Sequence, residues 1–143
     1  MRTIKHATTP EEIEDAKSVR RLVFQIEQCI DQASDFDEND DSAMHFVAYE
    51  EKPIGAARVR FPDHKKRAKV ERVSVIPEHR GSGVGKELMM AIHDHLQDLE
   101  VEELYLDAQT HVKNFYEKLG YTQEGEVFEE VGIPHIVMAK RLR

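Results

Sequence analysis

The sequence has few of the residues and segments that mark several protein classes. It contains one cysteine and no tryptophan in 143 residues. A lone Cys29 excludes an internal disulfide and forms neither a metal nor a redox motif, so we expect it to be buried near a helix end. No apolar run is long enough to span a bilayer, and no secretory segment follows Met1. We therefore expect a cytoplasmic protein with one domain, residues 1–143.

Basic charge is also scarce. Lys and Arg number 20 against 28 Asp and Glu, which gives a net charge of −8. Such a surface repels phosphate, so neither nucleic acid nor a membrane is an expected partner. The acidic run 35–41 predicts a solvated loop, and the alternative is an acidic mouth that attracts a cationic amine. No exposed apolar stripe requires a second copy of the chain, although a homodimer stays open.

Hydrophobic periodicity predicts an α/β domain. The first helix begins at the capping box formed by Thr9 and Glu12, keeps an apolar stripe from Ile13 to Ile30, and breaks by residue 34. Two further helices are expected at 83–99 and 110–119, and strands at 2–7, 44–49, 54–61, 69–76, 103–109, 121–130 and 134–140. A helix between the fourth and fifth strands makes them parallel. We expect a mixed, largely antiparallel central sheet with helices on both faces.

The segment from Val73 to Lys86 reads as a strand, a glycine-rich turn and the start of a helix. Such a turn aims unpaired N–H groups at one point, where the helix dipole adds positive charge, and this predicts a pyrophosphate site. The glycines let the ligand approach the backbone closely, and Arg80 adds charge. The segment is not a P-loop, because Glu87 follows Lys86, and its alternating glycines do not match the dinucleotide fingerprint.

Three sets of residues in the chain resemble one known family. Arg80-x-x-Gly83-x-Gly85, preceded by Val-x-Val-x-Pro, resembles the coenzyme A loop of the GNAT superfamily of N-acetyltransferases. The segment Asn114–Tyr121 is similar to a second landmark of that superfamily. Features of the ElaA/YjcF-like branch are found in Val23-Phe24-x-x-Glu27-Gln28, Ala108-Gln109 and Gly132-Ile133-Pro134-His135. The resemblance covers essentially the whole chain and implies that the two parallel strands splay apart to hold the pantetheine arm of acetyl-CoA.

The resemblance also implies roles for individual residues. Tyr116 matches the tyrosine that protonates the departing thiolate, which suits a phenol with a reference pKa of about 10, and the alternative is a core aromatic. Asn114 is expected to contact the pantetheine arm. The other expected cofactor-binding residues are Val73, Ser74, Val75, Arg80, Gly81, Ser82, Gly83, Val84, Gly85 and Lys86.

The general base has several candidates. Glu71 shares a strand face with Val73 and Val75 and is the first choice, although Lys69 stands where other branches carry a glutamate. Its rivals are Glu27 and His135, both also assigned to acceptor binding, and a chain of water molecules. No metal is expected, because His93 and His95 are two residues apart on a helix and cannot share a face.

The predicted reaction is transfer of an acetyl group from acetyl-CoA to a primary amine, with a small cationic acceptor slightly favoured. Acetyl and longer acyl donors both stay open. One alternative is a non-catalytic acyl-CoA-binding sensor or regulatory module, in which the cradle is intact and the acceptor site inactive. A further alternative is an interaction protein with a vestigial loop, which would bind no coenzyme A.

Overall fold

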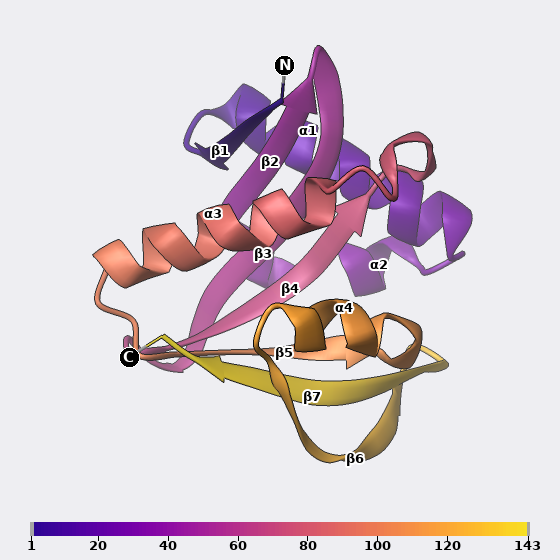
Figure 1. Ribbon diagram of the computed structural model, residues 1–143. Coiled ribbons are helices and arrows are strands. Elements are labelled where there is room, and N and C mark those ends of the chain that lie inside the picture. Colours follow the sequence, from indigo (N-terminus) through magenta and orange to yellow (C-terminus); the bar gives the residue numbers. More distant parts are fainter. Residues whose placement is uncertain (1, 143) are drawn as a thin grey trace.

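The computed structural model describes residues 2–142, apart from the side chains of residues 33 and 34. Its seven strands form one sheet in the order β1-β2-β3-β4-β5-β7-β6 (Figure 1). Their bounds are β1 Thr3–Ala7, β2 Met44–Glu50, β3 Lys52–His64, β4 Arg67–Val75, β5 Glu103–Gln109, β6 Thr122–Glu130 and β7 Ile133–Arg141. The β4–β5 pair is parallel and the other neighbours are antiparallel, which confirms the predicted mixed sheet.

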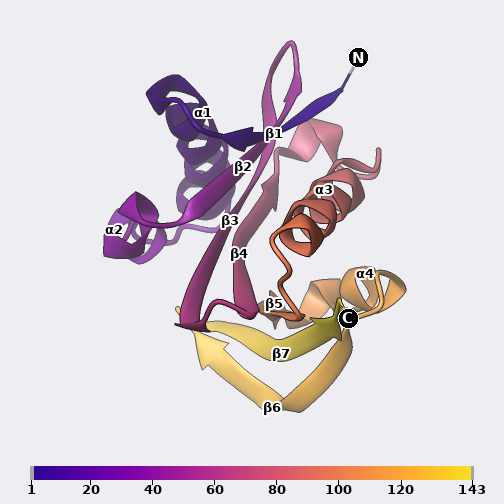
Figure 2. The ribbon, with the colours of Figure 1, turned by 90° about the vertical axis from the view of Figure 1, so that its left-hand side faces the viewer.

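Helices cover both faces of the sheet (Figure 2). One face carries α1 (Pro10–Arg20) and α2 (Gln32–Asp35), and the other carries α3 (Val84–Asp98) and α4 (Lys113–Lys118). Shorter turns are a π-helix η1 (Arg21–Glu27) and the 3₁₀ segments η2 (Glu38–Asp41), η3 (Pro77–His79) and η4 (Thr110–Val112). Within residues 2–142, no helix has both the length and the apolar character needed to cross a bilayer.

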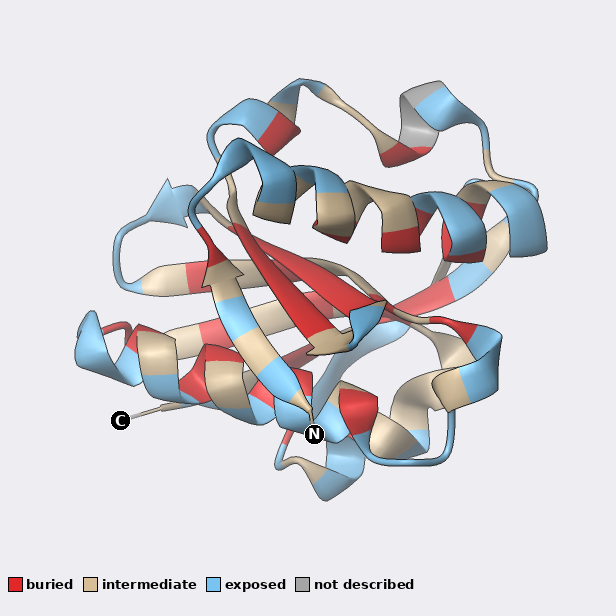
Figure 3. Ribbon diagram, turned by 90° about the horizontal axis from the view of Figure 1, so that it is seen from above, coloured by how far each residue is buried: buried red, intermediate tan, exposed pale blue. Residues whose placement is uncertain are grey.

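The core lies between the sheet and the inner sides of these helices (Figure 3). On α3 the predicted stripe is buried at Val84, Leu88, Ile92 and Leu96. Leu99 is 51% exposed, contrary to prediction, because α3 ends at Asp98 and the chain turns away there. The stripe on α3 therefore fixes the helix against the sheet and places its N-terminus at the end of β4.

The first helical segment starts as predicted and then changes its winding. Thr9 Oγ1 accepts a hydrogen bond from the Glu12 amide at 3.1 Å, and the Glu12 carboxylate accepts one from the Thr9 amide at 3.2 Å. After Arg20 the chain follows a wider π-helix, which turns different residues inward. Ile26, predicted on the buried stripe, is therefore 64% exposed. Cys29 is exposed rather than buried, and it follows the end of η1 with a left-handed φ of 58°.

Candidate functional site

The two parallel strands separate halfway along their length. Their pairing runs from Arg67 opposite Glu103 to Val70 opposite Leu106 and ends there. On its other side β4 stays paired with β3 as far as Val75. Arg72 has a left-handed φ of 58°, and the β3–β4 register shifts beside it. This bulge turns the end of β4 away from β5 and leaves the β5-facing backbone of residues 71–75 outside the β4–β5 ladder.

A cleft of about 910 Å³ lies at this opening. Its walls come from β4, β5, η1, the glycine loop, η4, α4 and β7. Of the residues predicted to bind the cofactor, those that line the cleft are Val73, Ser74, Val75, Arg80, Gly81, Gly83, Val84, Gly85 and Lys86. Ser82 and Asn114 are exposed and lie outside the lining. All four residues predicted for catalysis or acceptor binding, Tyr116, Glu71, Glu27 and His135, line it.

The glycine loop lies at the N-terminus of α3. Gly81 and Gly83 have left-handed φ values of 79° and 90°, which disfavour any other residue there. Gly83 caps α3 without a side-chain hydrogen bond, so the amides of the first turn remain available to an anion. Gly85 serves a different purpose: a Cβ there would lie 3.2 Å from Cζ of Phe115, so it allows α3 and α4 to pack closely.

Arg2 supports the same loop from the other end of the chain. Its guanidinium donates to the Ser82 carbonyl and the Ser82 hydroxyl, both at 3.1 Å, and it also pairs with Glu87 on α3. Nothing in the sequence signals this contact, because Arg2 lies before the first strand and far from the loop along the chain. Arg2 therefore holds the loop against the start of α3, and Glu87 and Glu50 offset its charge.

Tyr116 forms part of the cleft wall from α4. Its ring makes edge contacts with Phe115 at 4.9 Å and with Tyr121 at 5.7 Å between centroids, and the residue is 6% exposed. Burial raises the pKa of Tyr116 above its ordinary value, so the phenol is protonated at neutral pH. Both the core-aromatic interpretation and a proton donor facing the cleft fit this position.

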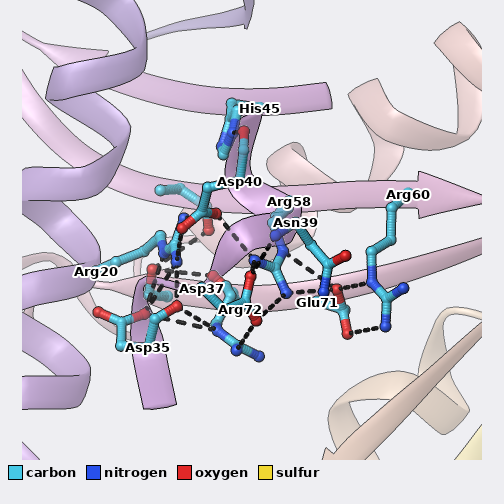
Figure 4. Close-up of polar contacts among 12 residues, drawn as sticks. Arg20, Asp35, Asp37, Asn39, Asp40, His45, Arg58, Arg60, Glu71 and Arg72 are labelled. Carbon is cyan, nitrogen blue, oxygen red and sulfur yellow. Dashed lines mark hydrogen bonds and ion pairs between the residues drawn. The ribbon is translucent and has the colours of Figure 1, made fainter. Parts of the chain in front are cut away.

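Glu71 is surrounded by cations (Figure 4). Its carboxylate accepts hydrogen bonds from Arg58 Nη2 and Arg60 Nε, each at 2.7 Å, and lies 3.3 Å from Lys69 Nζ. Burial alone would raise the pKa of Glu71, but these hydrogen bonds and charges lower it to about 2. Glu71 is therefore ionised at neutral pH and has little affinity for a proton.

The acidic run is not the solvated loop that the sequence predicts. Asp35 and Asp40 are 1% and 5% exposed. Arg20 reaches Asp35 at 3.2 Å and Asp40 at 2.7 Å, and Arg58 reaches Asp40 at 2.9 Å (Figure 4). Burial would raise the pKa of Asp40, but the two arginines lower it to about 2. The run is buried because it pairs with arginines on α1 and β3. These elements are distant in the sequence, so the run itself does not predict the pairing.

The same network reaches the bulge of β4. Arg72 donates from Nε to the Asp35 backbone carbonyl and from Nη2 to Asp37, both at 3.2 Å. Asp37 also accepts from Arg58 Nη1 at 2.7 Å. The acidic run is thus an internal counter-charge for three arginines, and it ties the segment after η1 to the edge of the cleft.

A group of polar side chains from several elements also lines the cleft. Gln28 and Gln109 hydrogen-bond each other through their amides, the shorter contact being 3.0 Å, and the His111 ring lies 2.7 Å from Gln109 Oε1. His135 donates from Nδ1 to the Ile133 carbonyl at 2.7 Å and stacks on Phe128. In the described part of the chain, no group of His, Cys, Asp and Glu side chains is arranged to hold a metal ion.

The sequence and the structure were compared with known proteins. The family described as "Acetyltransferase (GNAT) domain" matches residues 7–142. The uncharacterized N-acetyltransferase YjcF of Bacillus subtilis is 38% identical, with 94% of this chain and 96% of YjcF covered. Protein ElaA of Escherichia coli is 35% identical, with 87% of this chain and 84% of ElaA covered.

Solved structures agree with the sequence relatives. The crystal structure of Escherichia coli ElaA superposes with a TM-score of 0.84 at 28% identity and covers 98% of each chain. A structure of an aminoglycoside 6'-N-acetyltransferase complexed with coenzyme A superposes with a TM-score of 0.79, covers 99% of this chain and 97% of its own, and at 16% identity shares the fold alone. The glycine loop, the separated strand pair and these matches together show that the chain belongs to the GNAT family of acetyltransferases, in the branch that includes YjcF and ElaA.

Proposed function

We propose that this chain transfers an acetyl group from acetyl-CoA to a primary amine. The observation that carries the proposal is one cleft that joins an uncapped helix N-terminus to the free edge of β4. The helix N-terminus can bind a pyrophosphate, and the unpaired edge of β4 can hydrogen-bond the amides of an extended ligand. Membership of an acetyltransferase family supports the same assignment.

The proposed cofactor contacts are mostly main-chain contacts. Amides of residues 81–86 would bind the pyrophosphate, with Arg80 and Lys86 adding charge. The backbone of Val73–Val75 would pair with the pantetheine arm and donate to the thioester carbonyl, as an oxyanion hole does. Asn114 stays a prediction as a contact of the arm. Ser82 likewise stays a prediction, because both residues are exposed and lie outside the lining of the cleft.

The proposed reaction is a direct attack. The amine nitrogen bonds to the acetyl carbon, the carbon–sulfur bond breaks, and the thiolate takes the proton of the Tyr116 hydroxyl. The amine proton leaves to solvent, and Tyr116 regains a proton from the same source, so the charges balance. Because its pKa is about 2, Glu71 is a weak base, and we assign it to holding a water molecule that relays the proton. Glu27 and His135 both line the cleft, and their predicted contact with the acceptor stays a prediction.

The proposed acceptor is a primary amine, and a small cationic amine is slightly favoured. Carboxylates of Glu27, Glu71 and Asp107 all line the cleft, which would attract a positive charge. Each of these also contacts a cation of the protein, namely Arg80, Arg58 and Lys69 respectively. An acceptor cation would therefore compete with internal partners, so the preference for it is modest.

Release of free coenzyme A from acetyl-CoA against polyamines, amino sugars, amino acids and lysine peptides tests the proposal. Release that depends on one class of amine supports an acetyltransferase and identifies its acceptor. Saturable acetyl-CoA binding without release across the panel would instead favour the sensor or regulatory module.

A further inference from the structure

An ion pair at the mouth of the cleft links the glycine loop to the first helical segment. Arg80 donates from Nη1 and Nη2 to the two carboxylate oxygens of Glu27 at 2.6 and 2.5 Å. Its Nε donates to the Val75 carbonyl at 2.9 Å. All three guanidinium nitrogens are thus engaged, while the two side chains remain 42% and 38% exposed. An anion that accepts hydrogen bonds from both Nη1 and Nη2 of Arg80 must displace the carboxylate of Glu27.

The position of Glu27 makes a cationic partner necessary. Glu27 is the last residue of η1, and the C-terminal end of a helix carries partial negative charge, which disfavours a carboxylate. The hydrogen bond from Arg80 compensates for this and lowers the pKa of Glu27. The carboxylate of Glu27 at the end of η1 therefore attracts a cation, and in the free protein that cation is Arg80.

Carboxylate and phosphate make the same kind of bidentate contact with a guanidinium. Arg80 directly precedes Gly81–Lys86, the segment assigned above to the pyrophosphate. We propose that Glu27 occupies Arg80 in place of a phosphate, and that acetyl-CoA displaces it from Arg80 on binding. This inference rests on the proposed binding of acetyl-CoA to that loop.

The exchange has a consequence for the acceptor end of the cleft. Once Arg80 binds phosphate, the carboxylate of Glu27 loses its internal partner. It then lies beside Gln28, whose amide bonds Gln109 across the cleft, and it is free to attract an ammonium group. Binding of acetyl-CoA and of a cationic acceptor would thus favour each other, because coupling between two ligands is reciprocal.

Calorimetric titration of the whole protein with acetyl-CoA at low salt tests the exchange. Glu27→Gln removes the competing carboxylate, so its Kd should fall by roughly two- to fivefold, the scale of an exposed ion pair. Glu78→Gln is the matched control, because Glu78 is exposed, lies two residues from Arg80 and acts on it only through charge. The control should change Kd by clearly less. In an Arg80→Gln background, Glu27→Gln should have no further effect.

Two results would overturn the exchange while leaving the proposed function standing. One is weaker binding by Glu27→Gln, which would mean that Glu27 aims Arg80 at the phosphate. The other is an equal effect of both glutamate variants, which would mean that only long-range charge matters. If the wild-type protein binds no acetyl-CoA at millimolar concentration, the proposed function fails, and this inference fails with it.

Discussion

At the scale of single residues, Tyr116 is the group whose chemistry the reaction depends on most. Tyr116→Phe removes the proposed proton donor and keeps the ring contacts with Phe115 and Tyr121. Turnover should fall by about 10²-fold or more, because a positioned general acid contributes on that scale. The Kd of acetyl-CoA should stay within about twofold. Steady-state kinetics and calorimetry on the same preparation measure both quantities.

A neighbouring tyrosine provides the control. Tyr121 is as buried as Tyr116, but its hydroxyl bonds His93 at 2.8 Å and it does not line the cleft. Tyr121→Phe should lower stability by about 1 kcal/mol through the lost hydrogen bond and leave turnover unchanged. If Tyr116→Phe weakens cofactor binding and keeps full turnover, the assigned role is wrong.

His93 makes stability depend on pH. Burial, helped by the charge of Lys140, lowers the pKa of His93 to about 4, whereas an unfolded histidine has a pKa of about 6.5. The unfolded chain therefore binds a proton more readily, and the folded state loses stability as the pH falls from 6.5 to 4. This one group accounts for a loss of roughly 3 kcal/mol over that range.

Urea unfolding at a series of pH values measures this effect. His93→Gln should flatten the dependence between pH 6.5 and 4, whatever its effect on stability at pH 7. An unchanged slope in the variant would assign the acid sensitivity to other groups. Half-buried His6 and buried His45 also have lowered pKa values and would leave part of the slope in place.

At the scale of elements, the arginine–carboxylate network fixes the segment after η1 against β3 and β4. Arg58→Met leaves Asp40 and Glu71 buried without one of their cations. Such a loss is expected to cost about 3–5 kcal/mol in the free energy of unfolding, because an uncompensated buried charge remains. Chemical denaturation at pH 7 measures the change.

Arg67→Met is the comparison within the same sheet. Arg67 on β4 pairs with Asp63 on β3 and with Glu103 on β5, and all three side chains are in contact with water. Its loss should cost about 1 kcal/mol, as for other ion pairs in contact with water. Equal losses for the two variants would contradict the claim that burial makes the Arg58 network structurally important.

The helix and strand pattern was largely predictable from local signals. The capping box at Thr9, the stripe on α3 and the connection between β4 and β5 depend on neighbouring residues, and each gave the observed element. The π-helix was not predictable, because a change of winding after Arg20 leaves no distinct periodicity in so short a stretch. The exposure of Ile26 and Cys29 follows from that change.

At the scale of the whole molecule, the fold brings together groups that the sequence keeps apart. The glycine-rich turn at the start of α3 could be predicted, because its signals are local to residues 80–86. The partners of that loop, Arg2 and Glu27, come from other parts of the chain, and no local pattern indicates that they contact it. The acidic run likewise forms ion pairs with arginines on α1 and β3. The local conformation of the loop was therefore predictable from the sequence, and the long-range charge pairing was not.

We expect the separated strands and the glycine loop to bind acetyl-CoA together. Titration calorimetry of the purified protein with acetyl-CoA tests it most directly, with Gly83→Val as the variant that a left-handed φ of 90° does not accommodate. We expect saturable one-to-one binding by the wild-type protein and weaker binding by the variant, with the sheet still folded by circular dichroism. No saturable binding to the wild-type protein at millimolar acetyl-CoA would contradict it.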